Sequence, residues 1–205
     1  MNDDSQLLVG IDLDYTLLDV DRFFYDNVLP ALCEAYPEVV EREAFISSMN
    51  DFRQNFGPAN EYDFFGQITS MGLDADAVEA HIEAAVTGHD FLRPGAADFV
   101  ALQLQNQHDV RIITIGVDRY QLFKKRCIPL LNGVPVHVIR EAKGAFIAKE
   151  FDGRHGYMVD DKLLVDLPKT IKPIYIRSRK SENLPDDAFD GFSELLATGP
   201  AELIN

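Results

Sequence analysis

The chain has 205 residues, of which 46% are hydrophobic and 26% are charged, enough for one well-packed core and a smaller attached domain. Its formal net charge of −15 makes nucleic acid and an anionic membrane surface unfavourable partners. The two cysteines lie far apart, the N-terminus is acidic where a signal peptide would be basic, and no apolar run has transmembrane length, so we expect a soluble cytoplasmic protein.

The first predicted element is an apolar strand, Leu7 to Ile11, and two aspartates follow it. In the segment VGIDLDYTLLD, Asp12 and Asp14 are separated by one residue, and Thr16 comes two residues later. Carboxylates beside an apolar sheet cost stability unless a cation offsets their charge. Asp14 or Thr16 could instead cap a turn. The strand before them favours a functional site at its carboxyl end.

A long segment, about Asp21 to Leu92, separates this strand from the next one. Its apolar residues recur at helical spacing, and it contains no convincing strand. Because it is far too long for a loop, we expect a helical insertion with its own small core, to which most of its aromatic residues belong. The tripeptide Arg93 to Gly95 marks the return to the main domain, with Pro94 suited to a helix start. The predicted domains are 1–20 with 93–205, and 21–92.

Four further short apolar runs follow the insertion and alternate with helical patterns. The predicted strands are Val110 to Ile115, Pro135 to Ile139, Tyr157 to Val159 and Pro173 to Ile176. The predicted helices are Gly95 to Gln107, Asp118 to Leu131, Ala142 to Phe151 and Lys162 to Lys169. This alternation predicts a parallel sheet with helices on both faces, and ligands bind beyond the carboxyl ends of such strands.

Polar residues follow three of these strands. The segment GYMVDDKLLVD ends a strand with Asp160 and Asp161, although Asp161 could instead cap the helix predicted to follow. Thr114 lies at the end of another strand, where a threonine by itself is more often structural. Lys143 lies at the start of the helix after a third strand, where a lone lysine is usually solvated.

Together with Asp12 and Asp14, the Asp160–Asp161 pair would gather four carboxylates at neighbouring strand ends. Two unit charges about 4 Å apart repel by roughly 4 kcal/mol at an effective dielectric constant of about 20. Such a group of oxygen ligands favours a hard divalent cation, and we expect Mg²⁺.

In this order the motifs resemble those of the haloacid dehalogenase (HAD) superfamily of phosphotransferases and phosphatases. DLDYTL is similar to its DxDxT signature, Thr114 in TIG to its second-motif threonine, Lys143 to its third-motif lysine and VDDKLLVD to its terminal acidic motif. The resemblance covers about residues 5–20 and 93–180. It implies a Rossmann-like α/β fold with an inserted all-helical cap of the C1 type.

The resemblance also implies roles for the motif residues. Asp12 would attack phosphorus to form an aspartyl-phosphate, and Asp14 would act as general acid and then as general base. Magnesium would be held by Asp12, the backbone carbonyl of Asp14 and one of the Asp160–Asp161 pair, for which the spacing to Asp166 favours Asp161.

Thr114 and a lysine would hold the phosphoryl oxygens in this scheme. The lysine is Lys143. Because the sequence separation between Lys143 and Asp160 is short for this family, Lys149 stays a second, weaker candidate. Dehalogenating relatives lack the acid–base carboxylate at the Asp14 position, which favours phosphorus as the target. The substrate would be a small phosphorylated metabolite.

Three alternatives stay open at this point. The chain could be a non-catalytic phosphate- or metal-binding protein on the same fold, or a phosphomutase of the same superfamily. A signalling receiver module also gathers aspartates at strand ends, but it has no large insertion after its first strand.

Overall fold

The computed structural model describes residues 6–56 and 59–198, so the acidic N-terminal residues 1–5 lie outside the described part. The chain forms two compact units. We call residues 1–19, 92–114 and 134–205 the sheet unit, and residues 20–91 and 115–133 the helical unit. Over the described ranges, no helix combines the length and apolar character needed to cross a lipid bilayer.

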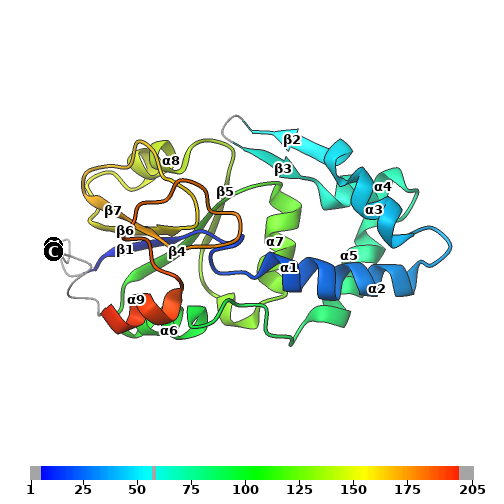
Figure 1. Cartoon of the computed structure of the whole chain (residues 1–205), viewed down its shortest axis with the longest axis horizontal. Helices are drawn as coiled ribbons and strands as arrows, with labels where there is room; N and C mark the ends of the chain where they lie inside the picture. Colours follow the sequence, from blue (N-terminus) through cyan, green and yellow to red (C-terminus); the bar gives the residue numbers. More distant parts are fainter. Residues whose placement is uncertain (1–5, 57–58, 199–205) are drawn as a thin grey trace. The chain divides into compact units, whose positions relative to one another are not determined.

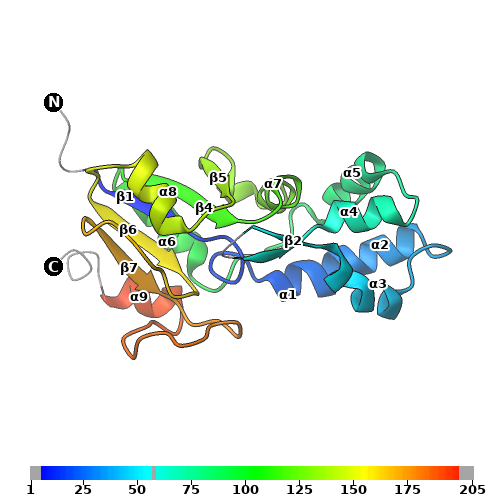
Figure 2. The same cartoon turned by 90° about the horizontal axis from the view of Figure 1, so that it is seen from above.

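A five-stranded sheet forms the centre of the sheet unit, as the sequence predicts. Its strands are β1 (Leu8–Ile11), β4 (Asp109–Ile115), β5 (Val136–Ile139), β6 (Gly156–Asp160) and β7 (Ile171–Tyr175). They lie in the order β5-β4-β1-β6-β7, which can be followed in Figure 2. β1 pairs in parallel with β4 and β6, and β6 pairs in parallel with β7. All four residues of β1 are buried, which fits a central strand.

Helices cover both faces of this sheet. α8 (Lys143–Glu150) lies on one face, whereas α6 (Ala96–Gln105) and α9 (Phe192–Thr198) lie on the other (Figure 1). α6 packs on α9 through the rings of Phe99 and Phe192, whose centroids are 5.1 Å apart. The Rossmann-like α/β prediction is therefore confirmed.

The helical unit contains most of the predicted insertion. Its helical elements are α1 (Val20–Phe23), the π-helical turn η1 (Phe24–Val28), α2 (Leu29–Ala35), α3 (Arg42–Ser48), the 3₁₀ turn η2 (Met49–Phe52), α4 (Phe64–Ser70), α5 (Ala75–Val86), α7 (Asp118–Arg126) and the 3₁₀ turn η3 (Pro129–Leu131). Its core is aromatic: Phe23, Phe24, Phe64 and Phe65 are buried, whereas Tyr25 and Tyr62 are partly exposed.

The insertion also carries a short antiparallel hairpin that the sequence did not predict. β2 (Arg53–Asn55) pairs with β3 (Asn60–Tyr62). All three residues of β2 are exposed, and their polar side chains give no apolar alternation that would identify a strand.

Residues 115–133 group with the helical unit, although the predicted boundaries put them in the main domain. The buried ring of Phe123 in α7 packs against the aromatic core of the insertion, and ion pairs join α7 to α5. Arg119 pairs with Asp76 and Glu79, and Arg126 pairs with Glu79 and Glu83. The functional division into a catalytic domain and a cap stays a prediction.

The predicted helix at Lys162 to Lys169 is wrong, because the chain is irregular there. Asp166 has a φ of +57°, which a helix does not tolerate, and Pro168 has no N–H to donate. Leu163 and Val165 are exposed, so the apolar spacing that suggested a helix does not mark a buried face. Because no helix directly follows Asp161, the alternative role of Asp161 as a helix cap is also wrong. The predicted helix at Asp118 to Leu131 is shorter and is followed by the separate turn η3.

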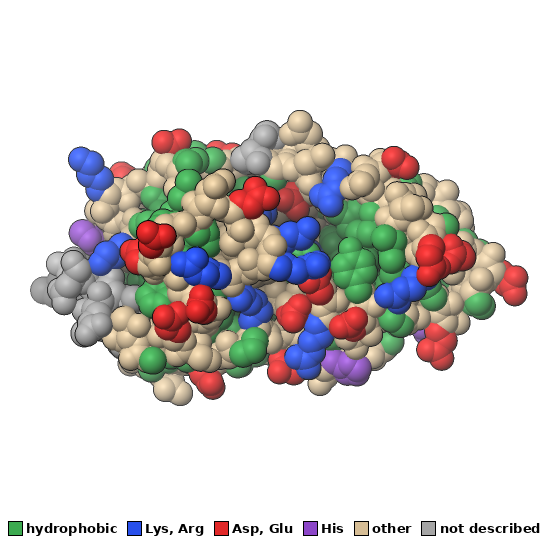
Figure 3. All heavy atoms as spheres, viewed as in Figure 1, with side chains coloured by type: hydrophobic (Ala, Val, Ile, Leu, Met, Phe, Trp, Pro, Cys, Tyr) green, Lys and Arg blue, Asp and Glu red, His purple; other side chains and the backbone are tan. Residues whose placement is uncertain are grey.

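Charged side chains are mixed on the surface. On the face in Figure 3, the Lys and Arg side chains of the described residues are dispersed among Asp and Glu. The expectation that nucleic acid is a poor partner stays a prediction.

Gly144, directly after Lys143, allows a test of how closely α8 packs against the backbone of the segment after β6. A Cβ atom there would meet the backbone carbonyl oxygens of Val165 and Asp166. We expect Gly144→Ala to lower the free energy of unfolding by about 1–3 kcal/mol, because rigid backbone must shift. Gly191→Ala is the control, since a Cβ there meets no atom within 4 Å. Urea denaturation of both variants checks this, and equal effects would contradict the close approach at Gly144.

Candidate active site

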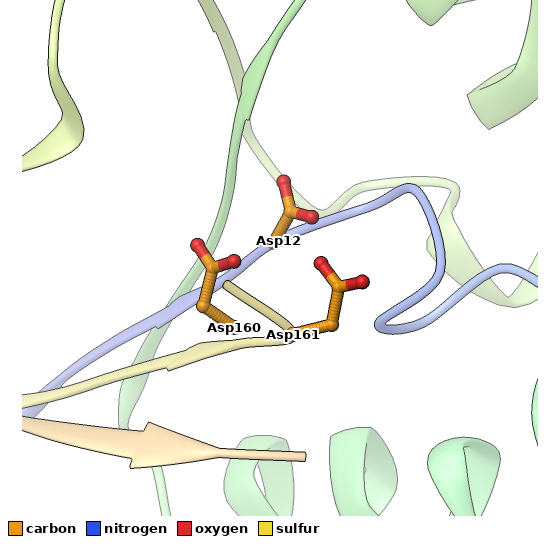
Figure 4. Close-up of side chains that lie close together, drawn as sticks. All are labelled: Asp12, Asp160 and Asp161. Atoms are coloured by element: carbon orange, nitrogen blue, oxygen red, sulfur yellow. The ribbon is translucent and has the colours of Figure 1, made fainter. Parts of the chain in front are cut away.

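Three carboxylates converge where two adjacent strands end. β1 and β6 pair with Ile11 opposite Val159, and the N–H of Asp12 donates to the carbonyl of Val159 at 2.9 Å. Asp12 therefore lies beside Asp160, the last residue of β6, and Asp161, which follows it. One carboxylate oxygen from each of the three aspartates lies within 4.8 Å of the other two. Figure 4 shows the three side chains gathered on one side of these strand ends.

Lys143 neutralises part of this negative charge. As the first residue of α8, it places its Nζ 2.6 Å from Oδ1 of Asp12 and 2.5 Å from Oδ2 of Asp160. Lys149, the alternative from the sequence, lies on the exposed side of α8 with its Nζ 3.0 Å from Glu150. The structure therefore brings Lys143 to the carboxylates and leaves Lys149 outside the cluster.

The cluster is almost completely buried, which shifts the pKa values of its members. Burial raises the pKa of Asp12 to about 6, against the opposing effect of Lys143 and with a further increase from Asp160. Burial and the charge of Asp12 also raise the pKa of Asp161. Burial alone would lower the pKa of Lys143, but the charges of Asp12 and Asp160 outweigh it and raise this pKa.

Asp160 and Asp161 differ in what their oxygens contact. Asp160 uses both oxygens: Oδ2 accepts from Lys143, and Oδ1 accepts from the N–H of Lys162 at 2.9 Å. Asp161 uses one: Oδ2 accepts from the hydroxyl of Ser178 at 2.7 Å. Among the described residues, Oδ1 of Asp161 is buried and has no hydrogen-bond partner. Of the pair, Asp161 is therefore the one with an oxygen available to a ligand.

These contacts fit a divalent cation. Three buried carboxylates and one ammonium leave a formal charge of about −2 when all are ionised, which one such ion would neutralise. A buried carboxylate oxygen without a partner is costly, and a metal ion would satisfy it. An all-oxygen donor set is the kind that Mg²⁺ prefers. The residues present therefore fit the expected metal.

The remaining predicted residues lie on the same edge of the sheet unit. Thr114 is buried in β4, two residues beyond Ile112, which pairs with Ile11. Asp14 follows Asp12 in a tight turn, in which the N–H of Leu18 donates to the carbonyl of Leu13 at 2.8 Å. The side chain of Asp14 is not among the three that converge.

Two residues that support the site were missed in the sequence. The guanidinium of Arg93 donates to the carbonyl of Tyr15 at 2.7 Å and to the carbonyl of Arg177 at 2.6 Å, and so links the turn after β1 to the chain after β7. Ser178 comes from that second segment and bonds Asp161. The RPG tripeptide in the sequence was a signal that could have identified Arg93. Ser178 lies in a polar loop, where a serine gives no such signal.

Comparisons with known proteins identify the fold. No protein-family model and no curated protein match the chain. A solved haloacid dehalogenase-like hydrolase of Burkholderia xenovorans matches 98% of this chain and 99% of its own, with a TM-score of 0.62 and 18% identity. A HAD phosphatase of Thermococcus onnurineus matches 97% of this chain and 100% of its own (TM-score 0.61, 14% identity).

A HAD hydrolase of Bacillus subtilis, solved with bound magnesium, matches 94% of this chain and 98% of its own, with a TM-score of 0.54 and 16% identity. At such low identities these matches establish the fold. The chain thus has the fold of the HAD-like hydrolases over nearly its whole length, as its motifs suggested.

The raised pKa of Asp12 leads to a prediction for the metal-free protein. Folded Asp12 keeps its proton up to about pH 6, whereas its ordinary value is 3.8, so stability is lost as the pH rises through this window. Asp12→Asn resembles the protonated form. We therefore expect it to be more stable than the parent at about pH 8, by up to about 3 kcal/mol, and equally stable at about pH 4.

Thermal unfolding in EDTA at both pH values measures this difference. Asp98→Asn, an exposed carboxylate in the first turn of α6, is the control and should change stability little at either pH. A stability gain in Asp12→Asn that is the same at both pH values would contradict the account.

Proposed function

We propose that this chain, which has the HAD-like hydrolase fold, is a magnesium-dependent phosphatase that hydrolyses a small phosphate monoester. The observation that carries the proposal is the buried cluster of Asp12, Asp160 and Asp161 with Lys143, at the carboxyl ends of adjacent strands. Such strand ends are where ligands bind in parallel α/β sheets. A cytoplasmic location and a phosphorylated metabolite as substrate belong to the same proposal.

Asp12 would be the nucleophile. A carboxylate oxygen of Asp12 attacks phosphorus, the bond to the leaving oxygen breaks, and an aspartyl-phosphate forms on the protein. Its raised pKa of about 6 still leaves Asp12 mostly ionised at neutral pH. Lys143, 2.6 Å from Asp12, would reduce the repulsion between the nucleophile and an anionic substrate and stabilise the charge on the transferring oxygens.

Asp14 would transfer the proton. In the first step it gives a proton to the leaving alkoxide, and in the second it takes one from the water that attacks the aspartyl-phosphate. Thr114, at the end of β4, would donate its hydroxyl hydrogen to a phosphoryl oxygen. These roles follow the resemblance and the position of both residues near the carboxyl edge of the sheet.

A bound magnesium ion would offset the negative charge of the substrate and the carboxylates. Asp12 and Oδ1 of Asp161 would be its protein ligands, together with the backbone carbonyl of Asp14. Asp160 would instead hold Lys143, because both its oxygens are already engaged. The magnesium bound in the Bacillus subtilis structure supports this choice of ion.

The insertion at about residues 21–92 would act as a cap that selects the substrate. Tyr25 and Tyr62 are the candidates for this selection, since they are partly exposed. Phe23 and Phe65 are buried in the helical unit and belong to its core. The presence of Asp14 favours phosphate esters over haloacids, because a departing halide needs no proton.

The test is Mg²⁺-dependent release of inorganic phosphate from p-nitrophenyl phosphate. We expect Asp12→Asn to lower turnover at least about a thousandfold while the protein stays folded, because the nucleophile is lost. Asp14→Asn should affect esters with poor leaving groups much more than p-nitrophenyl phosphate, which needs little proton donation. Asp98→Asn is the matched control and should keep parental turnover.

The outcomes separate the competing functions. Release of halide from a haloacid without phosphatase activity would indicate a dehalogenase, and transfer of phosphate within a sugar phosphate without free phosphate would indicate a phosphomutase. Magnesium binding without turnover on a broad panel of phosphate esters would indicate a non-catalytic protein. Near-parental activity in Asp12→Asn would exclude Asp12 as the nucleophile.

A further inference from the structure

The two oxygens of Asp161 have different surroundings. Oδ2 accepts a hydrogen bond from the hydroxyl of Ser178 at 2.7 Å, whereas Oδ1 is buried and has no hydrogen-bond partner within the described part of the chain. A free carboxylate can rotate and exchange its oxygens. The bond to Ser178 distinguishes them, because it fixes one oxygen and thereby sets the direction of the other.

Ser178 is itself held in place by the two residues that precede it. The N–H of Ile176 donates to the carbonyl of Asp160 at 2.9 Å, which continues the pairing of β6 and β7 past the end of β7. The carbonyl of Arg177 accepts from Arg93 at 2.6 Å. These two bonds attach the segment before Ser178 to β6 and to Arg93, and so hold the hydroxyl of Ser178 next to Asp161.

The direction of the hydrogen bond is also determined. The hydroxyl oxygen of Ser178 accepts from the N–H of Lys180 at 3.0 Å, and the N–H of Ser178 donates to the hydroxyl of Ser181 at 2.8 Å. An ionised carboxylate only accepts hydrogen bonds. The hydroxyl hydrogen of Ser178 is therefore donated to Asp161, and the closed turn at 178–181 keeps it there.

We propose that Ser178 is a positioning residue for the metal site, which orients Asp161 so that its Oδ1 faces a divalent cation shared with Asp12. The inference rests on the proposed function only in so far as that function requires a metal. Groups that orient metal ligands in this way commonly change metal affinity by about tenfold to a hundredfold when they are removed.

A merely structural role for Ser178 would have a different signature. If the hydroxyl only anchored the turn at 178–181, its loss would lower stability without changing the affinity for magnesium. If it positions Asp161, its loss lowers the affinity even in protein that is fully folded. Magnesium affinity measured without substrate separates these two roles.

The experiment is isothermal titration of the full chain with Mg²⁺, in the absence of substrate, for the parent and three variants. We expect Ser178→Ala to weaken binding about tenfold or more, and Ser178→Thr, which keeps the hydroxyl, to stay within about threefold of the parent. Ser181→Ala is the control from the same turn, since Ser181 supports Ser178 but has no bond to Asp161; it should weaken Mg²⁺ binding much less than Ser178→Ala, by no more than about threefold. Thermal unfolding in EDTA verifies that each variant is folded.

Two results would overturn the inference while leaving the proposed function intact. One is Mg²⁺ binding by folded Ser178→Ala that is as tight as in the parent. The other is an equal loss in Ser181→Ala, which would assign the effect to the turn and not to the hydroxyl bond. If the parent itself binds no Mg²⁺, the proposed function and this inference both fail.

Discussion

The burial of three carboxylates close to one another is the constraint on which the site depends. Asp12, Asp160 and Asp161 are each at most 5% exposed, and their oxygens approach to within 4.8 Å. Burying like charges together opposes folding unless cations offset them. Lys143 offsets one of the charges, but burial, with a further contribution from Asp160, still raises the pKa of Asp12. A protein that keeps such a cluster gains something from it other than stability, and metal-assisted chemistry is the gain that we propose.

The parallel sheet makes this cluster possible because it brings the ends of distant segments to one edge. β1 is central and pairs with both β4 and β6, so residues that follow these strands become neighbours. Helix α8 brings Lys143 to the cluster, and Arg93 links the turn after β1 to the chain after β7. The side chains of the site thus lie in regular elements or directly after them, and such fixed positions favour preorganised chemistry.

The sequence predicted the features that arise from local pattern. Asp12 and Asp160 directly follow apolar runs, and the strand–helix alternation implied that they meet at one sheet edge. Other features depend on contacts that no local pattern contains. Ser178 lies in a polar loop, and its role arises only from its hydrogen bond to Asp161. The grouping of residues 115–133 with the helical unit involves ring packing and ion pairs between helices that are distant in sequence. The segment at 162–169 has helical apolar spacing, but Asp166 and Pro168 override it.

The position of the metal ion can be determined in a crystal structure of the protein grown with Mn²⁺ in place of Mg²⁺, because Mn²⁺ scatters X-rays anomalously. We expect one ion bonded to a carboxylate oxygen of Asp12 and to Oδ1 of Asp161, with Lys143 still paired with Asp160. An ion bound by Asp160 in place of Asp161, or crystals saturated with Mn²⁺ that show no ion at these carboxylates, would contradict this expectation.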